Sequence, residues 1–282
     1  MKAPPHGIIE SETPPMPRER WFLRAAMLLV LLVCGAACAE QPAKVGEVPA
    51  DLREKLKLDP FYKKHVSAGG LPVLSSEKVS DAGVLEAVYL INQMLADRED
   101  IRQALIKNRV RFVVMAPTEM TTDVPEQRRL KNDPKTDWDK RARGLGGRIT
   151  SCGEENLLNL RGDRYRNENI LIHEFSHAIH NLGLRTVDPK FDARLREIYK
   201  KAMDASLWKD TYAATNHSEY WAEGVQSYFD CNAPPARGVH NDINTREKLA
   251  KYDPDLFELI DEVFKKSKYR YVRYDRRPPP EK

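Results

Sequence analysis

One short helical motif constrains this chain more than any other feature of its sequence. Residues 170–180 read Ile-Leu-Ile-His-Glu-Phe-Ser-His-Ala-Ile-His, so that His-Glu-x-x-His runs from His173 to His177. Histidines four residues apart lie on one face of an α-helix, and both imidazoles can then reach one metal ion. The apolar residues around them have the spacing of a helix packed in a core. We therefore predict a buried helix over 167–182, capped by Asn167, with both histidines as ligands of Zn²⁺.

Glu174 follows the first histidine directly, and a helix of 3.6 residues per turn places it about 100° further around the axis. There it would flank the metal and contact a metal-bound water, which is the position of a general base. His180 lies seven residues after His173, or about 10 Å along the axis, so one ion cannot bind both. We interpret three further histidines as ordinary surface or core residues: His65, His217 and His240.

The third metal ligand is predicted in an acidic motif, Asn-His-Ser-Glu-Tyr-Trp-Ala-Glu at 216–223. Glu219 and Glu223 share one face of the expected helix. In such a pair the first carboxylate binds the metal and the second accepts a hydrogen bond from a ligand imidazole. Burying both beside aromatic residues would be costly without a cation or hydrogen-bond partners. The alternative is an acidic helix face in solvent.

Together, the two motifs resemble the gluzincin metallopeptidases, and in particular the catalytic domain of anthrax lethal factor and its relatives. Those proteins carry His-Glu-Phe-Gly-His and Asn-Glu-Ala-Glu-Phe-Phe-Ala-Glu, and the resemblance spans 165–230. It implies that Glu219 is the third zinc ligand, that Tyr212 assists catalysis, and that the substrate is a peptide or protein. Ser176 stands where the family has glycine, which keeps a small residue at that position. The family's substrate-docking domains have no counterpart here.

Residues 1–39 are predicted to be a secretory signal peptide. Basic residues at 18–24 precede an apolar run, and small residues end it at Ala37-x-Ala39. The apolar stretch from 25 to 39 is shorter than the roughly 18 residues of a membrane-spanning helix. We therefore expect a secreted or periplasmic protein, attached to the membrane only if this segment stays uncleaved. A lipid anchor at Cys38 is a weaker alternative.

Export also bears on the cysteines and the charge of the mature chain. Only Cys152 and Cys231 remain after cleavage, and an oxidising compartment favours a disulfide between them. The formal net charge of the whole chain is only +4, which is too small to indicate nucleic acid as a partner. A run over 265–277 interleaves tyrosines with basic residues, and we interpret it as a solvated strand and tail.

Hydrophobic spacing predicts an α+β fold. The resemblance implies a zincin-like arrangement of it, with a small, partly β N-terminal lobe on a helical lobe and a zinc cleft between them. We assign 40–58 to a linker, 59–275 to a zincin-like catalytic domain and 276–282 to a disordered tail. A polar loop is expected over 118–148, and its glycines at 144–147 either hold substrate or form a structural hairpin. The other expected elements are a strand at 111–116, a second strand within 149–160, and helices at 81–96, 97–108, 189–205, 217–230 and 246–268, the last of them broken at Asp253-Pro254.

The motifs and their resemblance imply a secreted zinc-dependent metallopeptidase that acts through a zinc-activated water. Two alternatives remain open at this point. One is a zinc hydrolase that acts on a cell-wall or glycan substrate, since the same activated water can attack other electrophiles. The other is a non-enzymatic binding module that holds zinc structurally; the presence of Glu174 and Tyr212 argues against it, because a structural site needs neither.

Overall fold

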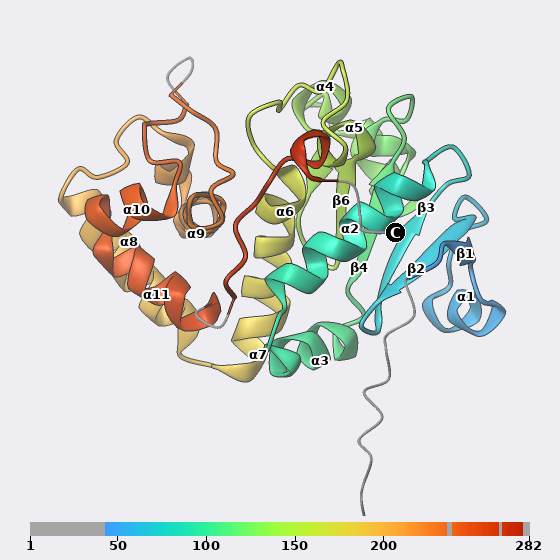
Figure 1. The fold of residues 1–282 in the computed structure, drawn as a ribbon, viewed down its shortest axis with the longest axis horizontal. Helices are drawn as coiled ribbons and strands as arrows, with labels where there is room; N and C mark the ends of the chain where they lie inside the picture. The colour runs from blue at the N-terminus through green and yellow to red at the C-terminus, as the bar shows by residue number, and fades with distance from the viewer. Residues whose placement is uncertain (1–42, 236–238, 265–266, 279–282) are drawn as a thin grey trace, which may run out of the picture. The chain divides into compact units, whose positions relative to one another are not determined.

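A six-stranded mixed sheet dominates the N-terminal half of the computed structural model, which describes residues 43–235, 239–264 and 267–278 (Figure 1). The strand order is β1-β2-β3-β4-β6-β5. Strands β3, β4 and β6 pair in parallel, and the other pairs are antiparallel. The strands are β1 (Gly46–Glu47), β2 (Lys64–Ala68), β3 (Leu71–Ser75), β4 (Arg111–Met115), β5 (Gly144–Leu145) and β6 (Ile149–Gly153).

Both faces of the sheet are covered, so that β3 and β4 are buried along their whole length and are mostly apolar. Phe112 and Val114 face the main core, whereas Val113 and Met115 face a smaller cluster on the opposite side. The main-core face is covered by α2 (Asp81–Met94), α3 (Glu99–Lys107) and α6 (Ile170–Ala178).

The C-terminal half is helical, and its helix α9 packs against α6. Its aromatic core is fixed by Asp253, whose carboxylate accepts hydrogen bonds from Trp208 Nε1 at 2.8 Å and from the Tyr220 hydroxyl at 2.6 Å. Four helices make up most of this half: α8 (Phe191–Asp204), α9 (His217–Tyr228), α10 (Arg246–Tyr252) and α11 (Pro254–Phe264).

Short helical segments connect these elements. The α-helical ones are α1 (Ala50–Leu56), α4 (Trp138–Arg141), α5 (Glu154–Leu157) and α7 (Arg185–Val187). The 3₁₀ segments are η1 (Thr121–Asp123), η2 (Pro125–Asn132), η4 (Tyr212–Thr215) and η5 (Tyr274–Arg276), and η3 (Ile179–Leu184) is a π-helix that continues α6. None of the helices among the described residues is long and apolar enough to span a membrane.

The predicted α+β class, with a sheet-containing N-terminal half and a helical C-terminal half, is confirmed. The assignment of 40–58 to a linker needs correction, because β1 and α1 lie within it. Helix α1 forms there because Leu52 and Leu56, one turn apart, pack on the outer face of the sheet. The polar loop expected over 118–148 contains η1, η2, α4 and β5.

The predicted disulfide is wrong, because Cys152 and Cys231 are separate buried thiols. Cys152 belongs to the interior strand β6, while Cys231 follows α9 and donates to the carbonyl oxygen of Gln226 at 3.4 Å. Burial raises the pKa of both thiols, so each behaves as a small apolar core residue.

The predictions for the two ends of the chain fall partly outside the described residues. The predicted signal peptide lies outside the described residues. The predicted tail at 276–282 begins inside the ordered fold, because Arg277 forms an ion pair with buried Glu86 at 2.7 Å. Its guanidinium also lies over the Tyr89 ring, 4.5 Å from the centroid. Residues 279–282 are outside the described range.

Candidate metal centre and cleft

Helix α6 presents its two motif histidines toward α9. Asn169, and not the predicted Asn167, caps the helix by accepting a hydrogen bond from the Ile172 backbone N–H at 2.9 Å. The Asn156 side chain adds support by accepting from the Ile170 N–H at 2.7 Å. The apolar face of the helix is fully buried, so the direction of its polar face is fixed by packing.

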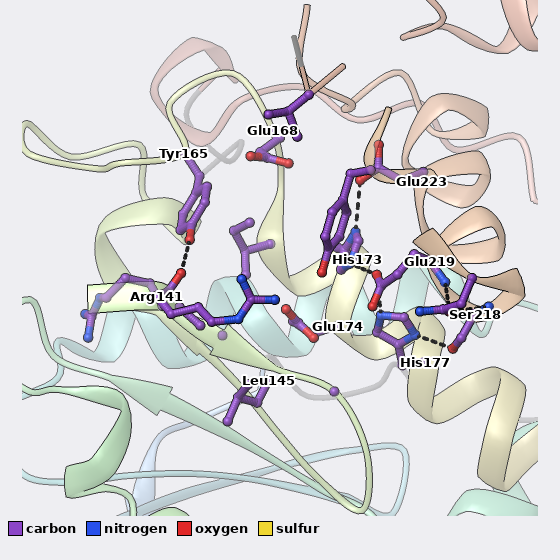
Figure 2. A pocket seen from close by; sticks show the side chains of 18 of the residues that line it. Arg141, Leu145, Tyr165, Glu168, His173, Glu174, His177, Ser218, Glu219 and Glu223 are labelled. Atoms are coloured by element: carbon purple, nitrogen blue, oxygen red, sulfur yellow. Dashed lines mark hydrogen bonds and ion pairs between the residues drawn. The ribbon is translucent and has the colours of Figure 1, made fainter. Parts of the chain in front are cut away.

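His173, His177 and Glu219 converge on one point (Figure 2). Glu219 Oε2 lies 3.1 Å from His173 Nε2 and 3.3 Å from His177 Nε2. A tetrahedral zinc ion with bonds of about 2.0–2.1 Å separates its ligand atoms by about 3.3 Å. The three side chains therefore match the donor set and spacing of a zinc site. Asn216 holds Glu219 in place by capping α9.

Each histidine also has a partner on its other ring nitrogen. His173 Nδ1 lies 2.8 Å from Gln226 Oε1, and His177 Nδ1 lies 2.9 Å from Ser218 Oγ. Such contacts fix ring orientation in metal sites. Glu223, which the sequence predicts for this role, is more distant, with its carboxylate 3.6 Å from His173 Nδ1.

Glu223 instead makes its shorter contacts with other groups. Its Oε2 lies 3.1 Å from His240 Nδ1 and accepts from Asn232 Nδ2 at 3.0 Å. His240 was interpreted as an isolated residue, but it lines the same cavity. Gln226, which the sequence analysis missed, lies one turn beyond Glu223 on the same face of α9, and that spacing could have found it.

The charges in this cluster favour a cation. Burial alone lowers the pKa of His173, but its hydrogen bond to Glu219 and the charges of Glu174, Glu223 and Glu219 raise it to about 10. Burial acts to raise the pKa of Glu219, and its contacts with both histidines outweigh this and lower it. Three carboxylates thus surround two imidazoles, and the negative charge that results attracts a divalent ion.

Glu174 points into the cavity beside His177 (Figure 2). Burial raises the pKa of its carboxyl, although the charges of both ligand histidines and a backbone hydrogen bond from Gly146 act in the opposite direction. The close approach of β5 and the turn after it to α6 requires glycine. A Cβ at Gly146 would lie 2.8 Å from the Glu174 carbonyl oxygen, and one at Gly144 would lie 3.1 Å from Glu174 Cγ.

Tyr212 lies beside His173, in η4. Its ring centroid is 6.2 Å from that of His173, and it lines the cavity. Its backbone N–H donates to Val239 at 2.8 Å, which holds the segment in place. Burial raises the pKa of the Tyr212 phenol to about 12, so the hydroxyl stays protonated and able to donate at neutral pH.

The cavity has a volume of about 530 Å³ and lies between the β5 edge of the sheet and helix α9. Strand β5 is an edge strand that pairs with β6 on one side. An extended peptide can add to such an edge through main-chain hydrogen bonds. Asn156 is buried and supports the start of α6, so it serves the fold. The remaining wall of the cavity includes Trp138, Arg141, Leu145, Tyr165 and Glu168.

No family model and no curated protein matches this chain. Among solved structures, the chain is similar to the Pro-Pro endopeptidase PPEP-2 from Paenibacillus alvei, with 20% sequence identity and a TM-score of 0.47. The match covers 68% of this chain and 96% of that chain. The resemblance to the lethal factor family stays a prediction. At this level of similarity, function has to be argued from the side chains of the site itself.

Proposed function

We propose that this protein is a zinc-dependent peptidase. The observation that carries the proposal is the convergence of His173, His177 and Glu219 at zinc-ligand spacing beside the carboxylate of Glu174. The three residues would hold the ion. When bound, zinc lowers the pKa of a coordinated water and polarises a substrate carbonyl.

Two side chains of this chain would supply the remaining chemistry. Glu174 would accept the proton of the attacking water and pass it to the nitrogen of the leaving amine. Burial raises the pKa of Glu174, which makes its carboxylate a stronger base and so assists the first half of this transfer. Tyr212 would donate a hydrogen bond to the oxyanion that forms on the substrate.

Peptide is favoured over glycan because of strand β5. Its free edge borders the cavity, and it offers main-chain donors and acceptors in the repeat that an extended peptide matches. A binding module with structural zinc is disfavoured, since such sites are closed by protein ligands, whereas this cluster opens into a cavity. Export of the enzyme depends on the predicted signal at 1–39.

An unbiased peptide-library digest tests the proposal. Purified mature protein, loaded with zinc, should generate new peptide termini that mass spectrometry detects. A chelator should stop their formation, and added zinc should restore it. Zinc-loaded protein that cleaves no peptide would contradict the proposal, and release of reducing ends from cell-wall glycan would favour the alternative hydrolase.

Replacing Glu219 tests the ligand set directly. Glu219→Ala should lose one equivalent of zinc relative to the wild type, because two imidazoles alone do not make a catalytic zinc site. The variant should also lose stabilisation by zinc, which for a bound ligand at about 1,000 times its Kd amounts to about 4 kcal/mol. Metal analysis and thermal unfolding measure both effects.

Glu168→Gln is the matched control, because Glu168 is a partly buried carboxylate in the same cavity that lies outside the ligand set. This variant should bind as much zinc as the wild type. Unchanged zinc content in Glu219→Ala would mean that another group is the third ligand.

A further inference from the structure

A second group of metal-binding side chains lies next to the candidate zinc centre. His180 comes from η3, Asp192 from α8, and His217 from the first turn of α9. Their ligand atoms all lie within 4.8 Å of one another. We call this group the HDH cluster. It shares no residue with the first centre, although His217 and His180 are close in sequence to Glu219 and His177.

The geometry of the HDH cluster is similar to that of the first centre. Asp192 Oδ1 lies 3.0 Å from His180 Nε2 and 3.5 Å from His217 Nε2. The corresponding distances from Glu219 are 3.1 and 3.3 Å. Both pairs lie near the spacing of about 3.3 Å between ligands of a tetrahedral zinc ion. In each cluster, one carboxylate oxygen faces two imidazole nitrogens.

Hydrogen bonding alone accounts poorly for this arrangement. The contact of 3.5 Å from His217 to Asp192 is longer than an ordinary N–H···O hydrogen bond of about 2.7–3.2 Å. Arg196 donates to Asp192 Oδ2 at 2.9 Å, which leaves Oδ1 directed at the two histidines. His180 is fully buried, and its Nδ1 has no hydrogen-bond partner among the described residues, so its polar interaction is through Nε2.

We propose that the HDH cluster binds a second transition-metal ion of the zinc class through His180, Asp192 and His217. Two imidazoles and one carboxylate suit zinc or a similar ion rather than calcium or magnesium, which prefer oxygen ligands. The side chains of Asp192 and His217 are each 19% exposed, which leaves a route for the ion and room for a water ligand.

Such an ion would fasten three segments that no disulfide joins. It would link η3 and α8 to the start of α9. Three consecutive residues there contact three different partners. His217 would bind the second ion, Ser218 orients the ring of His177, and Glu219 belongs to the first centre. We therefore assign the second ion a structural role, in which it holds the first turn of α9 and so positions the ligands of the catalytic site.

Zinc stoichiometry of the full mature chain tests this proposal. After incubation with zinc and removal of excess ion, wild-type protein should hold two equivalents. His217→Ala and Asp192→Asn, which alter the HDH cluster from two different helices, should each hold one. Glu219→Ala should also hold one, and the double variant Glu219→Ala/His217→Ala should hold none. Inductively coupled plasma mass spectrometry measures the content.

Arg196→Ala is the matched control, because it removes a side chain that contacts Asp192 without removing a ligand. It should keep two equivalents. Thermal unfolding adds a readout independent of activity: His217→Ala should show a smaller zinc-induced rise in Tm than the wild type, and the two should unfold alike in chelator.

The outcomes separate this proposal from the proposed function. One equivalent in the wild type, lost in Glu219→Ala but kept in His217→Ala, would overturn the second site and leave the first intact. One equivalent lost in His217→Ala but kept in Glu219→Ala would support the HDH cluster and contradict the catalytic centre. Two equivalents in all variants of the cluster, or none in the wild type, would overturn the proposal.

Discussion

Glu174→Gln is expected to lower kcat by about 10²–10⁴-fold while zinc content stays that of the wild type. Glutamine keeps the shape of the side chain but cannot accept the proton of the attacking water. Glu174 is not among the three converging ligands, so its replacement leaves the metal cluster whole. Steady-state hydrolysis of a peptide found in the library digest, together with metal analysis, measures the two quantities.

The same chemical change at Glu168 provides the comparison. Glu168→Gln also removes a partly buried carboxylate from the cavity, so it reproduces the electrostatic effect of the substitution without touching the proposed base. If general-base catalysis accounts for the loss in Glu174→Gln, the fold-loss of kcat in Glu168→Gln should be smaller by at least about tenfold. Equal losses in the two variants would mean that Glu174 acts through its charge alone.

The central part of the site could be predicted from the sequence because its geometry is local. Two histidines four residues apart in an apolar helix have little freedom, and α6 places them as the helical repeat requires. Glu219 also lies where expected, in the first turn of α9, although its approach to α6 depends on tertiary packing. The motif pair thus identified the residues that the structure brings together.

Contacts between distant segments could not be predicted in the same way. Ser218 is an example, because its separation from α6 in the chain gives no sign that its hydroxyl contacts His177. The HDH cluster was missed for a related reason. On an ideal α-helix, His180 is only too far from His173 to share a metal ion with it. In the structure, His180 lies in η3, which has π-helical geometry, and its ring contacts Asp192.

Two errors came from rules that consider composition without packing. Export and a count of two cysteines favoured a disulfide, but Cys152 lies in an interior strand and is surrounded by the core. The segment at 40–58 is rich in polar residues and contains two prolines, which is a composition typical of a linker. Its leucines nevertheless cover one face of the sheet, and a surface helix needs only such a stripe.

Tyr212→Phe should lower kcat by about 10²–10³-fold with little change in KM, if the hydroxyl donates to the oxyanion only in the transition state. The substitution removes one oxygen atom and keeps the ring beside His173, so zinc content should not change. Burial keeps the phenol protonated, with a pKa of about 12, and donation should therefore persist across the neutral range. Full kinetic constants on one peptide measure the effect.

Tyr165→Phe serves as the control because Tyr165 also lines the cavity, but its hydroxyl donates to the carbonyl oxygen of Arg141 at 3.3 Å. Its loss should alter kcat only slightly, since that hydrogen bond belongs to the wall of the cavity. A rise in KM at constant kcat in Tyr212→Phe would instead indicate that the hydroxyl binds the ground state. Wild-type kinetics in Tyr212→Phe would remove this residue from the mechanism and leave Glu174 and the metal cluster to account for catalysis.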